Sequence, residues 1–289
     1  MKQERLLHVH WALFDNHKAM QRLMQWDPDL QQVYTQSPSG LQTLLMLSPR
    51  QAQALFYCLH HIPLSSIISQ LQCEQIFYVT IWDADYPALL QQIYDPPFIL
   101  YGKGSRNLLQ HACKLAVVGT RTPSSYGMAS LQGILRDLLQ YDVLIVSGMA
   151  NGIDTAAHRL ALEQKKPTIA VLGGGFRYIY PQTNYTVLKK WQALLLLLSE
   201  YPPHVRPQKW HFPKRNRIIS GLSQGVLVAE AKERSGSLIT ADCALEQNRE
   251  LFAVPGPPFL PTAAGPNRLI QQGAKLVMNA ADIIEELWN

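Results

Sequence analysis

The segments 114–120 (KLAVVGT), 143–150 (VLIVSGMA) and 168–175 (TIAVLGGG) are apolar runs that end in glycine or small residues. Their spacing is that of a strand, a crossover helix and a return strand. Four further apolar runs continue the series, namely 194–201 (LLLLLSEY), 226–231 (VLVAEA), 251–256 (LFAVPG) and 275–278 (KLVM). Because strands that are apolar throughout are buried on both faces, the sequence predicts an α/β fold with a doubly wound, mainly parallel sheet.

The N-terminal quarter of the chain has a different pattern. Residues 5–72 place apolar side chains at helical spacing between turn sequences such as DPD and SPSG, which predicts short helices. Residues 76–101 combine strand-like runs with three prolines and are predicted to bridge the two patterns. We therefore expect a small all-helical domain over residues 1–75 and an α/β domain over residues 76–289.

Composition and termini limit the class of protein. A chain of 289 residues is long enough for one large core and a small accessory domain. No secretory signal begins the chain and no stretch approaches the length of a membrane span, which predicts a cytoplasmic location. The four cysteines lie far apart without a CxxC pair, so reduced thiols are expected in place of disulfides or a metal site: Cys58, Cys73, Cys113 and Cys243.

Positive charge is concentrated in the C-terminal part. Residues 101–289 hold 21 basic and 13 acidic side chains, and the segment between Glu200 and Glu230 holds no acidic residue. That segment carries five cations, with Trp210 and Phe212 among them: Arg206, Lys209, Lys214, Arg215 and Arg217. Cations attract phosphates and aromatic rings stack on unpaired bases, so the segment suits a single-strand nucleic-acid groove. The alternative is a solvated basic loop.

Ligands of a doubly wound sheet bind at the carboxyl ends of its strands, where glycines and serines cluster in this sequence. The first of these loops, 119–127 (GTRTPSSYG), lacks the GxGxxG pattern of dinucleotide sites, and the GxxxxGK[ST] pattern of triphosphate sites occurs nowhere. We expect no nucleotide cofactor.

Around 147–158, Gly148 and Gly152 allow close approach to a ligand, while His158 shares a helix face with Asp154, which predicts a structural contact between the two.

The order of the motifs resembles the DNA-processing protein A family, also called Smf. The resemblance runs from about residue 76 to the end of the chain, and residues 1–75 are compatible with the sterile-alpha-motif-like domain that many members carry. It is carried by eight motifs: VVGTRTPSSYG, VSGMANGIDTAAHRLAL, TIAVLGGGFRYIYP, SEYPP, FPKRNRIISGLS, VLVAEAKERSGSLITADCALEQNR, FAVPG and NRLIQQGA.

The resemblance implies an extended Rossmann-like domain that binds single-stranded DNA without sequence preference and forms a homodimer. It also implies protection of incoming DNA and loading of the RecA recombinase during natural transformation, without catalysis or a cofactor. The C-terminal region, 275–288, is implied to take part in the dimer and recombinase contacts. Because the sequence stops at Asn289, we expect no C-terminal winged-helix domain.

The family motifs also imply a site. Phosphate contacts are implied for Arg121, Lys209, Arg215, Asn216 and Arg217. Backbone amides of two segments are implied to line the same pocket: 147–152, with Ser147, Gly148, Asn151 and Gly152, and 235–237, with Ser235, Gly236 and Ser237. Trp210 and Phe212 are our own candidates for base stacking, with apolar anchoring of the basic loop as the alternative role.

A second class of function is an enzyme. The glycine pattern also resembles that of nucleotide phosphoribohydrolases, in which a carboxylate near the strand ends assists cleavage of an N-glycosidic bond, and Glu230 is the candidate here. The alternative for Glu230 is a pair with Arg234 or a helix cap. The PGGxGTxxE signature of those enzymes is missing from this sequence.

Overall fold

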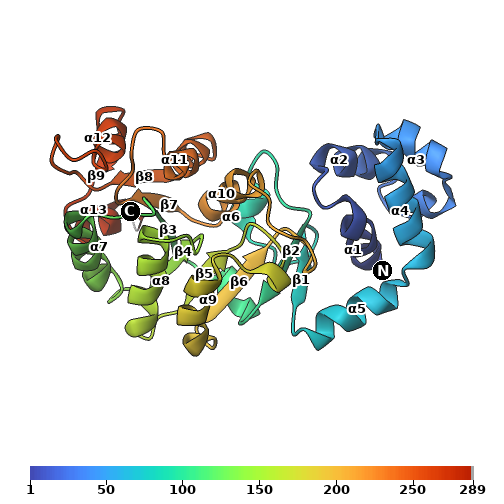
Figure 1. Ribbon diagram of the computed structural model, residues 1–289, viewed down its shortest axis with the longest axis horizontal. Coiled ribbons are helices and arrows are strands. Elements are labelled where there is room, and N and C mark those ends of the chain that lie inside the picture. Colours follow the sequence, from blue (N-terminus) through green and yellow to red (C-terminus); the bar gives the residue numbers. More distant parts are fainter. Residues whose placement is uncertain (288–289) are drawn as a thin grey trace.

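Figure 1 shows the computed structural model of the protein, which describes residues 1–287. The first helices are short: α1 (Lys2–Leu13), α2 (His17–Trp26), α3 (Pro38–Leu45), α4 (Pro49–His61) and α5 (Leu64–Cys73). Ser37 and Ser48 begin α3 and α4, each with its side chain accepting a hydrogen bond from the first turn. Pro38 and Pro49 follow at the first helical position, where the missing N–H has no helical partner to lose.

One sheet holds nine strands in the order β1-β2-β6-β5-β4-β3-β7-β8-β9. The strands from β3 onward are parallel: β3 (Lys114–Val118), β4 (Leu144–Ser147), β5 (Thr168–Val171), β6 (Leu195–Ser199), β7 (Gly225–Val228), β8 (Glu250–Ala253) and β9 (Lys275–Leu276). They coincide with the seven predicted runs, so the predicted sheet is confirmed. Within the predicted bridge, β1 (Phe77–Thr80) and β2 (Ile99–Lys103) extend the sheet as antiparallel strands beside β6.

Helices cover both faces of the sheet, as its alternating side chains require. Leu115 and Val117 of β3 pack with α7 (Ser125–Leu138) and α8 (Ile153–Glu163), whereas Ala116 and Val118 face the opposite cluster. That cluster includes α10 (His211–Gly221) and α11 (Gly236–Glu246). The remaining elements are α6 (Ala88–Gln91), α9 (Gln182–Leu188), α12 (Ala264–Gln271), α13 (Ala281–Leu287), η1 (Gln32–Thr35), η2 (Arg106–Gln110), η3 (Phe176–Tyr178) and η4 (Lys189–Trp191).

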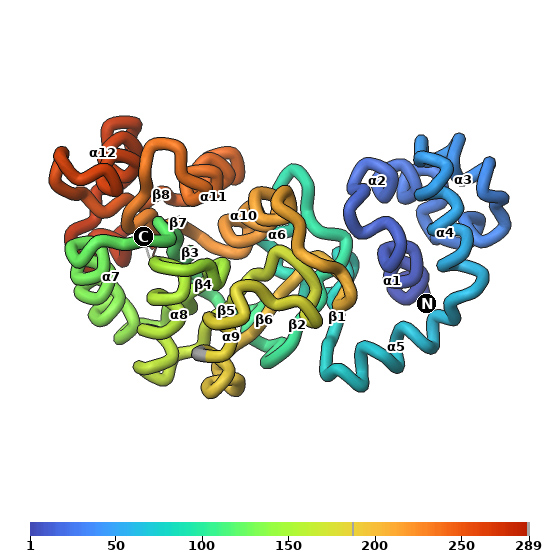
Figure 2. Tube along the Cα trace, in the orientation of Figure 1, coloured from blue at the N-terminus to red at the C-terminus, as the bar shows by residue number. Residues whose placement is uncertain are grey.

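The N-terminal helices gather at one end of the molecule, beyond β1 and β2 (Figure 2). They share one hydrophobic cluster with the neighbouring edge of the sheet, including the fully buried Tyr101 of β2. The Tyr101 hydroxyl lies 3.1 Å from Nδ1 of His10 in α1. Helix gives way to strand between Cys73 and Phe77, but the core continues across this point. The division into domains near residue 75 therefore stays a prediction.

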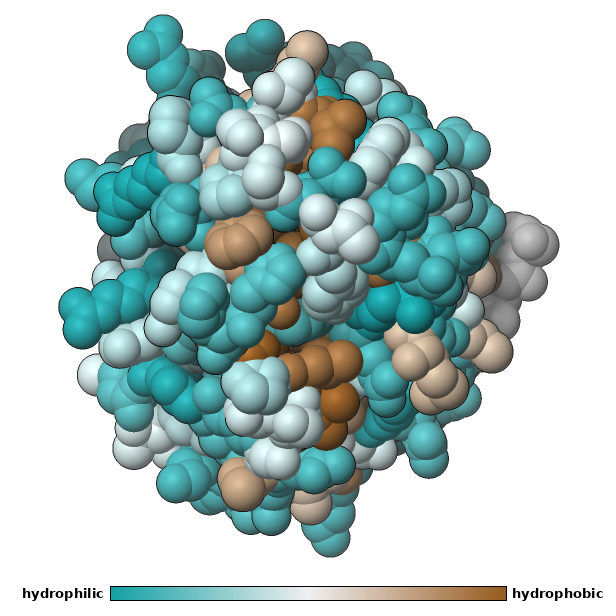
Figure 3. All heavy atoms as spheres, turned by 90° about the vertical axis from the view of Figure 1, so that its right-hand side faces the viewer, coloured by the Kyte–Doolittle hydropathy of each residue, from teal (hydrophilic) through white to brown (hydrophobic). Residues whose placement is uncertain are grey.

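Figure 3 views the molecule from the end formed by these helices. Hydrophilic side chains cover most of this face, and apolar atoms show as small patches along its centre. Of the helices within residues 1–287, none combines the length and the apolar character needed to cross a membrane.

Candidate nucleic-acid interface

The strand order reverses direction at β3, which has β4 on one side and β7 on the other. The connections leaving β3 and β7 therefore separate toward opposite ends of the sheet and leave a crevice between them, which is where doubly wound folds bind ligands. A pocket of about 820 Å³ lies there. Its lining comes from the loop after β3, from the start of α10 with the residues before it, and from the loop between β7 and α11.

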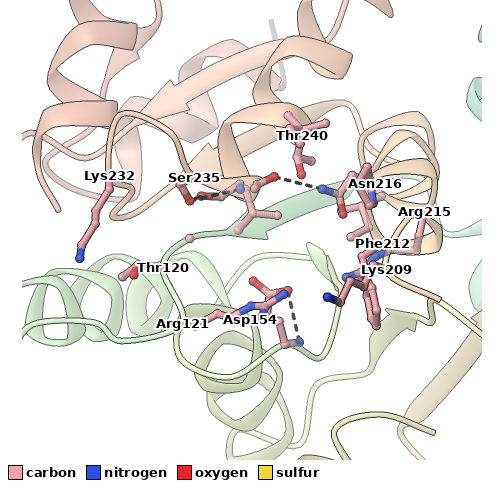
Figure 4. Close-up of a pocket in the computed structure, with 18 of the residues that line it drawn as sticks. Thr120, Arg121, Asp154, Lys209, Phe212, Arg215, Asn216, Lys232, Ser235 and Thr240 are labelled. Carbon is pink, nitrogen blue, oxygen red and sulfur yellow. Dashed lines mark hydrogen bonds between the residues drawn. The ribbon is translucent and has the colours of Figure 1, made fainter. Parts of the chain in front are cut away.

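Cations surround this pocket from three separate segments. Arg121, Lys209, Lys232 and Arg234 line it, and all four are exposed. None of them forms an ion pair with a residue in the part of the chain that the structure describes, whereas Lys214 and Arg217 nearby do. In Figure 4, Arg121 and Lys209 lie on the same side of the pocket as Asp154, and Ser235 and Asn216 lie on the opposite side. The arrangement leaves four positive charges free to meet an anion.

A buried arginine forms part of the pocket lining. Arg215 is only 5% exposed, and its Nη1 donates to the Val171 carbonyl at 2.7 Å, while its Nε has no hydrogen-bond partner. Burial lowers the pKa of Arg215, the Asp154 carboxylate raises it, and Arg121 lowers it. A buried donor without a partner is costly, so the described chain leaves part of the hydrogen-bonding capacity of Arg215 unused beside the pocket.

Asp154, at the start of α8, accepts hydrogen bonds from the backbone N–H groups of Gly148 at 3.2 Å and Ala150 at 3.4 Å. Burial raises its pKa, and the charge of Arg215 opposes that shift. The predicted contact between Asp154 and His158 is wrong, because the His158 ring instead lies 2.8 Å from the Thr168 hydroxyl. Burial, with a contribution from Arg215, lowers the pKa of His158 to about 3, so its ring is neutral at pH 7.

The predicted segment 147–152 lies beneath the pocket, and of its residues Ala150 belongs to the lining. Ser147 donates to the Val117 carbonyl, and Asn151 accepts a hydrogen bond from the Asn184 side chain. Gly148 and Gly152 leave space that other parts of this chain occupy. A side chain at Gly148 would overlap the Arg215 guanidinium, and one at Gly152, where φ is +78°, would overlap the backbone of residues 120–121.

The opposite side of the pocket is the N-terminus of α11. Ser235 caps this helix by accepting a hydrogen bond from the Ser237 N–H at 3.3 Å, and Gly236 accepts one from the Asn216 side chain at 3.1 Å. These four predicted residues all line the pocket. A helix N-terminus carries partial positive charge and free N–H groups, which adds to the attraction for anions.

Arg217 does not line the pocket. Its side chain is buried between Glu200, at 2.7 Å, and Asp95, at 2.8 Å. Although burial lowers the pKa of Arg217, the two carboxylates more than offset it and the pKa is raised. Its charge is therefore satisfied within the protein, and the predicted phosphate contact finds no support in this placement.

The two predicted stacking residues have different surroundings. Phe212 is half-buried and lines the pocket. Trp210 is 55% exposed outside the lining, and its Nε1 donates to Asp15 at 3.4 Å. Asp15 also pairs with Lys214 at 2.6 Å. The link between α1 and α2 thus holds two side chains of the basic segment.

Removing the charge of Asp15 should strengthen anion binding. Asp15→Asn frees Lys214, so we expect roughly fivefold tighter binding of a single-stranded oligonucleotide at low salt, in keeping with an exposed ion pair worth up to about 1 kcal/mol. The log–log salt slope, which is the slope of log binding constant against log salt concentration, should steepen by about 0.7 for one added phosphate contact. Asp29→Asn, the same change at another exposed N-terminal carboxylate, is the control. Equal behaviour of the two variants in fluorescence-anisotropy titrations would contradict the role of Asp15.

Sequence reasoning missed several lining residues, including Thr120, Tyr180, Lys232, Arg234 and Thr240. The alternation of charge in Lys232-Glu233-Arg234, directly before the Ser235-Gly236-Ser237 turn, is the one signal that could have found two of them.

Glu230, the candidate for an enzyme, is 2% exposed and does not line the pocket. Its carboxylate accepts hydrogen bonds from the Ser124 N–H at 2.8 Å, the Ser124 hydroxyl at 2.6 Å and the Thr262 hydroxyl at 2.8 Å. Ser124 caps α7, so Glu230 connects the end of β7 to the start of α7 and to the loop after β8. Within the described chain the Glu230 carboxylate therefore meets Ser124 and Thr262, and no ion pair joins it to Arg234.

We therefore expect Glu230→Gln to change stability. The amide keeps only one acceptor oxygen for three donors, so the free energy of unfolding should fall by about 1–3 kcal/mol in urea denaturation. Glu233→Gln, at an exposed neighbour, should stay within about 0.5 kcal/mol of the wild type. Release of free base from a nucleoside monophosphate by the wild type, and its loss in Glu230→Gln, would instead identify Glu230 as a catalytic group.

The four cysteines are free thiols, and in residues 1–287 no group of three or more His, Cys, Asp or Glu side chains is arranged to hold a metal ion.

Comparison with known proteins points to one family. Residues 77–288 match the family described as DNA recombination-mediator protein A. The chain is 48% identical over 224 residues to the DNA processing protein DprA of Bacillus subtilis, which covers 78% of this chain and 75% of the relative. The X-ray structure of DprA from Streptococcus pneumoniae superimposes with a TM-score of 0.85 and 35% identity, covering 100% of this chain and 99% of that one. A Helicobacter pylori DprA structure, described for its single-stranded DNA binding mode, has a TM-score of 0.65 and 32% identity, covering 73% and 95%.

Proposed function

The chain belongs to the DNA recombination-mediator protein A family, and from this premise we propose that it binds single-stranded DNA, without preference for sequence, in the pocket between β3 and β7. One observation carries the proposal: four exposed cations without carboxylate partners in the described chain converge on one pocket from segments far apart in the sequence. Phosphates are the part of a nucleic acid that such a site attracts, whatever the bases. The single-stranded DNA binding of the Helicobacter pylori relative supports the choice of ligand.

We assign the phosphate contacts to Arg121, Lys209 and Arg215, with Asn216 and the turn Ser235–Ser237 as further hydrogen-bond partners. Lys232 and Arg234 add two cations that line the same space. The segment 147–152 is proposed to act from beneath, by holding Arg215 and the loop after β3 in place. Arg217 is proposed to fix α10 against β6 through Glu200.

Binding by charge and by backbone groups requires no chemical step. The contacts of Glu230 give an architectural role to the carboxylate that the alternative enzyme would use, which supports a protein that binds DNA without catalysis. Such a site accepts any base, because the cations and the start of α11 contact only the sugar-phosphate chain.

The test is a fluorescence-anisotropy titration with labelled oligothymidine and with a duplex of the same length, at about 50 and 200 mM salt. We expect tighter binding of the single strand and a log–log salt slope of about −0.7 for each phosphate neutralised. Binding of oligocytidine and of oligothymidine should agree closely. Failure of the single strand to bind at the lower salt concentration would overturn the proposal.

The remaining parts of the proposal concern partners. We propose that the protein acts in the cytoplasm as a homodimer, protects incoming strands during natural transformation and helps load the RecA recombinase onto them. Two pockets of a dimer would hold one strand at two points, and the second contact would gain from the high effective concentration of the first. We also propose that residues 1–75 and residues 76–289 form two domains. Residues 288–289, at the end of the second, lie outside the described chain.

A further inference from the structure

Two exposed tyrosines stand beside the pocket, on the loop that follows β5. Tyr178 is 38% exposed and Tyr180 is 59% exposed. Tyr180 belongs to the pocket lining, and Tyr178, two residues earlier on the same loop, lies beside Arg206, which precedes the lining residues Pro207–Lys209. An exposed aromatic ring taken singly needs no explanation, but two rings bordering an unpaired cation cluster are the combination that binds unpaired bases.

The loop that carries them is firmly held. The Gly175 N–H donates to the Val205 carbonyl at 2.8 Å, and the Arg177 N–H donates to the Pro203 carbonyl at 3.1 Å. A side chain at Gly175 would overlap the backbone of residues 202–203, so the two loops are in direct contact. The tyrosines are thus presented from a braced surface, and a preorganised ring loses little entropy when a ligand stacks on it.

Each ring has one face or edge supported by the basic segment. The Arg206 guanidinium lies 4.9 Å from the centre of the Tyr178 ring. Arg206 is exposed and has no carboxylate partner in the described chain, whereas the adjacent Arg177 is paired with Glu74. The Tyr180 ring meets the Phe212 ring edge to face, with centres 6.0 Å apart and planes at 62°. These contacts orient the two rings and leave much of each exposed.

We propose that Tyr178 and Tyr180, with Arg206, form a base-stacking ledge that takes unpaired bases of the strand whose phosphates the pocket holds. The inference rests on the proposed function and extends it, since it assigns an aromatic subsite to residues outside the phosphate contacts. Stacking accepts every base, because each has a π face, and Arg206 adds a cation beside the same rings. The ledge lies on the side of the pocket formed by β5, so the strand would leave the pocket across the loop after β5.

The experiment compares labelled oligothymidine with an abasic sugar-phosphate chain of equal length, by anisotropy at one salt concentration. Tyr180→Ala and Tyr178→Ala should each weaken oligothymidine binding by roughly 5- to 140-fold, in keeping with about 1–3 kcal/mol for a stacked base. Binding of the abasic chain and the salt slope for oligothymidine should stay at wild-type values. Tyr180→Phe should keep the affinity, because it keeps the ring. Tyr57→Ala, which removes a 55% exposed tyrosine from α4, is the matched control and should change the binding of neither ligand.

The outcomes separate the two proposals. Wild-type protein that binds neither chain would overturn the proposed function. Wild-type protein that binds both, with Tyr178→Ala and Tyr180→Ala unchanged toward oligothymidine, would overturn the ledge alone. An equal loss for oligothymidine and the abasic chain would also overturn it, because a stacking contact cannot act on a strand without bases. Circular dichroism and urea denaturation of each variant confirm that the fold is kept.

Discussion

Arg121→Ala combined with Lys209→Ala is expected to weaken single-strand binding by about 100-fold, since two charge-assisted contacts at about 1.5 kcal/mol each are lost. The two residues approach the pocket from the loop after β3 and from the segment before α10, and neither has a carboxylate partner among the described residues. The log–log salt slope should become shallower by about 1.4, because two phosphates are no longer neutralised. Anisotropy titrations of labelled oligothymidine over a series of salt concentrations measure both effects.

A control must remove the same net charge elsewhere. Lys18→Ala with Arg136→Ala does so at two exposed positions outside the pocket lining. We expect its affinity to fall by no more than a few fold, since exposed charges more than about 10 Å from a ligand are largely screened at 0.1 M salt. Equal losses in the two double variants would mean that net charge, and not the pocket, governs binding.

Glu200→Ala is expected to lower the free energy of unfolding by about 3–5 kcal/mol, because it leaves Arg217 buried with one of its two partners gone. Glu200 is 7% exposed and Arg217 is 9% exposed. The control is Asp95→Ala. This second partner of Arg217 has a side chain that is 40% exposed, so its loss should cost no more than about 1 kcal/mol. Urea denaturation at pH 7 measures both variants.

Replacing the buried pair by apolar side chains gives a further check. Glu200→Leu combined with Arg217→Met should be much more stable than Glu200→Ala, since it leaves no buried charge unpaired and the remaining carboxylate, Asp95, is 40% exposed to solvent. Single-strand binding by this double variant should remain near the wild-type level if Arg217 only positions α10. A loss of binding and of salt dependence in a stably folded double variant would restore Arg217 to the phosphate site.

The parallel sheet could be predicted because each buried strand is apolar on both faces and ends in a glycine-rich loop. β1 and β2 were harder to predict as strands of this sheet, because prolines interrupt their segment. Only the pairing of β2 with β6 makes the segment part of the sheet. The basic segment could be recognised from its composition, but the sequence does not say which of its cations face the pocket and which pair with carboxylates. Arg215 and Arg217 are two positions apart on α10, which places them about 200° apart around the helix, so one reaches the pocket and the other the Glu200 side.

The glycines of 147–152 show a second limit of sequence reasoning. A glycine permits close approach, but the sequence does not say by what, and here the approaching group is the Arg215 side chain or the chain's own backbone. Lys232 and Arg234 were missed for a related reason. Their alternation with Glu233 does not say which cavity they face, and only the connection from β7 to α11 places both cations in the pocket lining.

The contact between Asp15 and Lys214 connects the link between α1 and α2 to α10, the helix whose first residues line the pocket. A coupling free energy between two sites acts equally in both directions. If Asp15 competes with a phosphate for Lys214, then a bound strand must loosen the attachment of the link between α1 and α2 to α10 by the same free energy. A bound strand should therefore be detected as faster amide hydrogen exchange in the residues that join α1 to α2, which belong to the N-terminal helical part and contact α10.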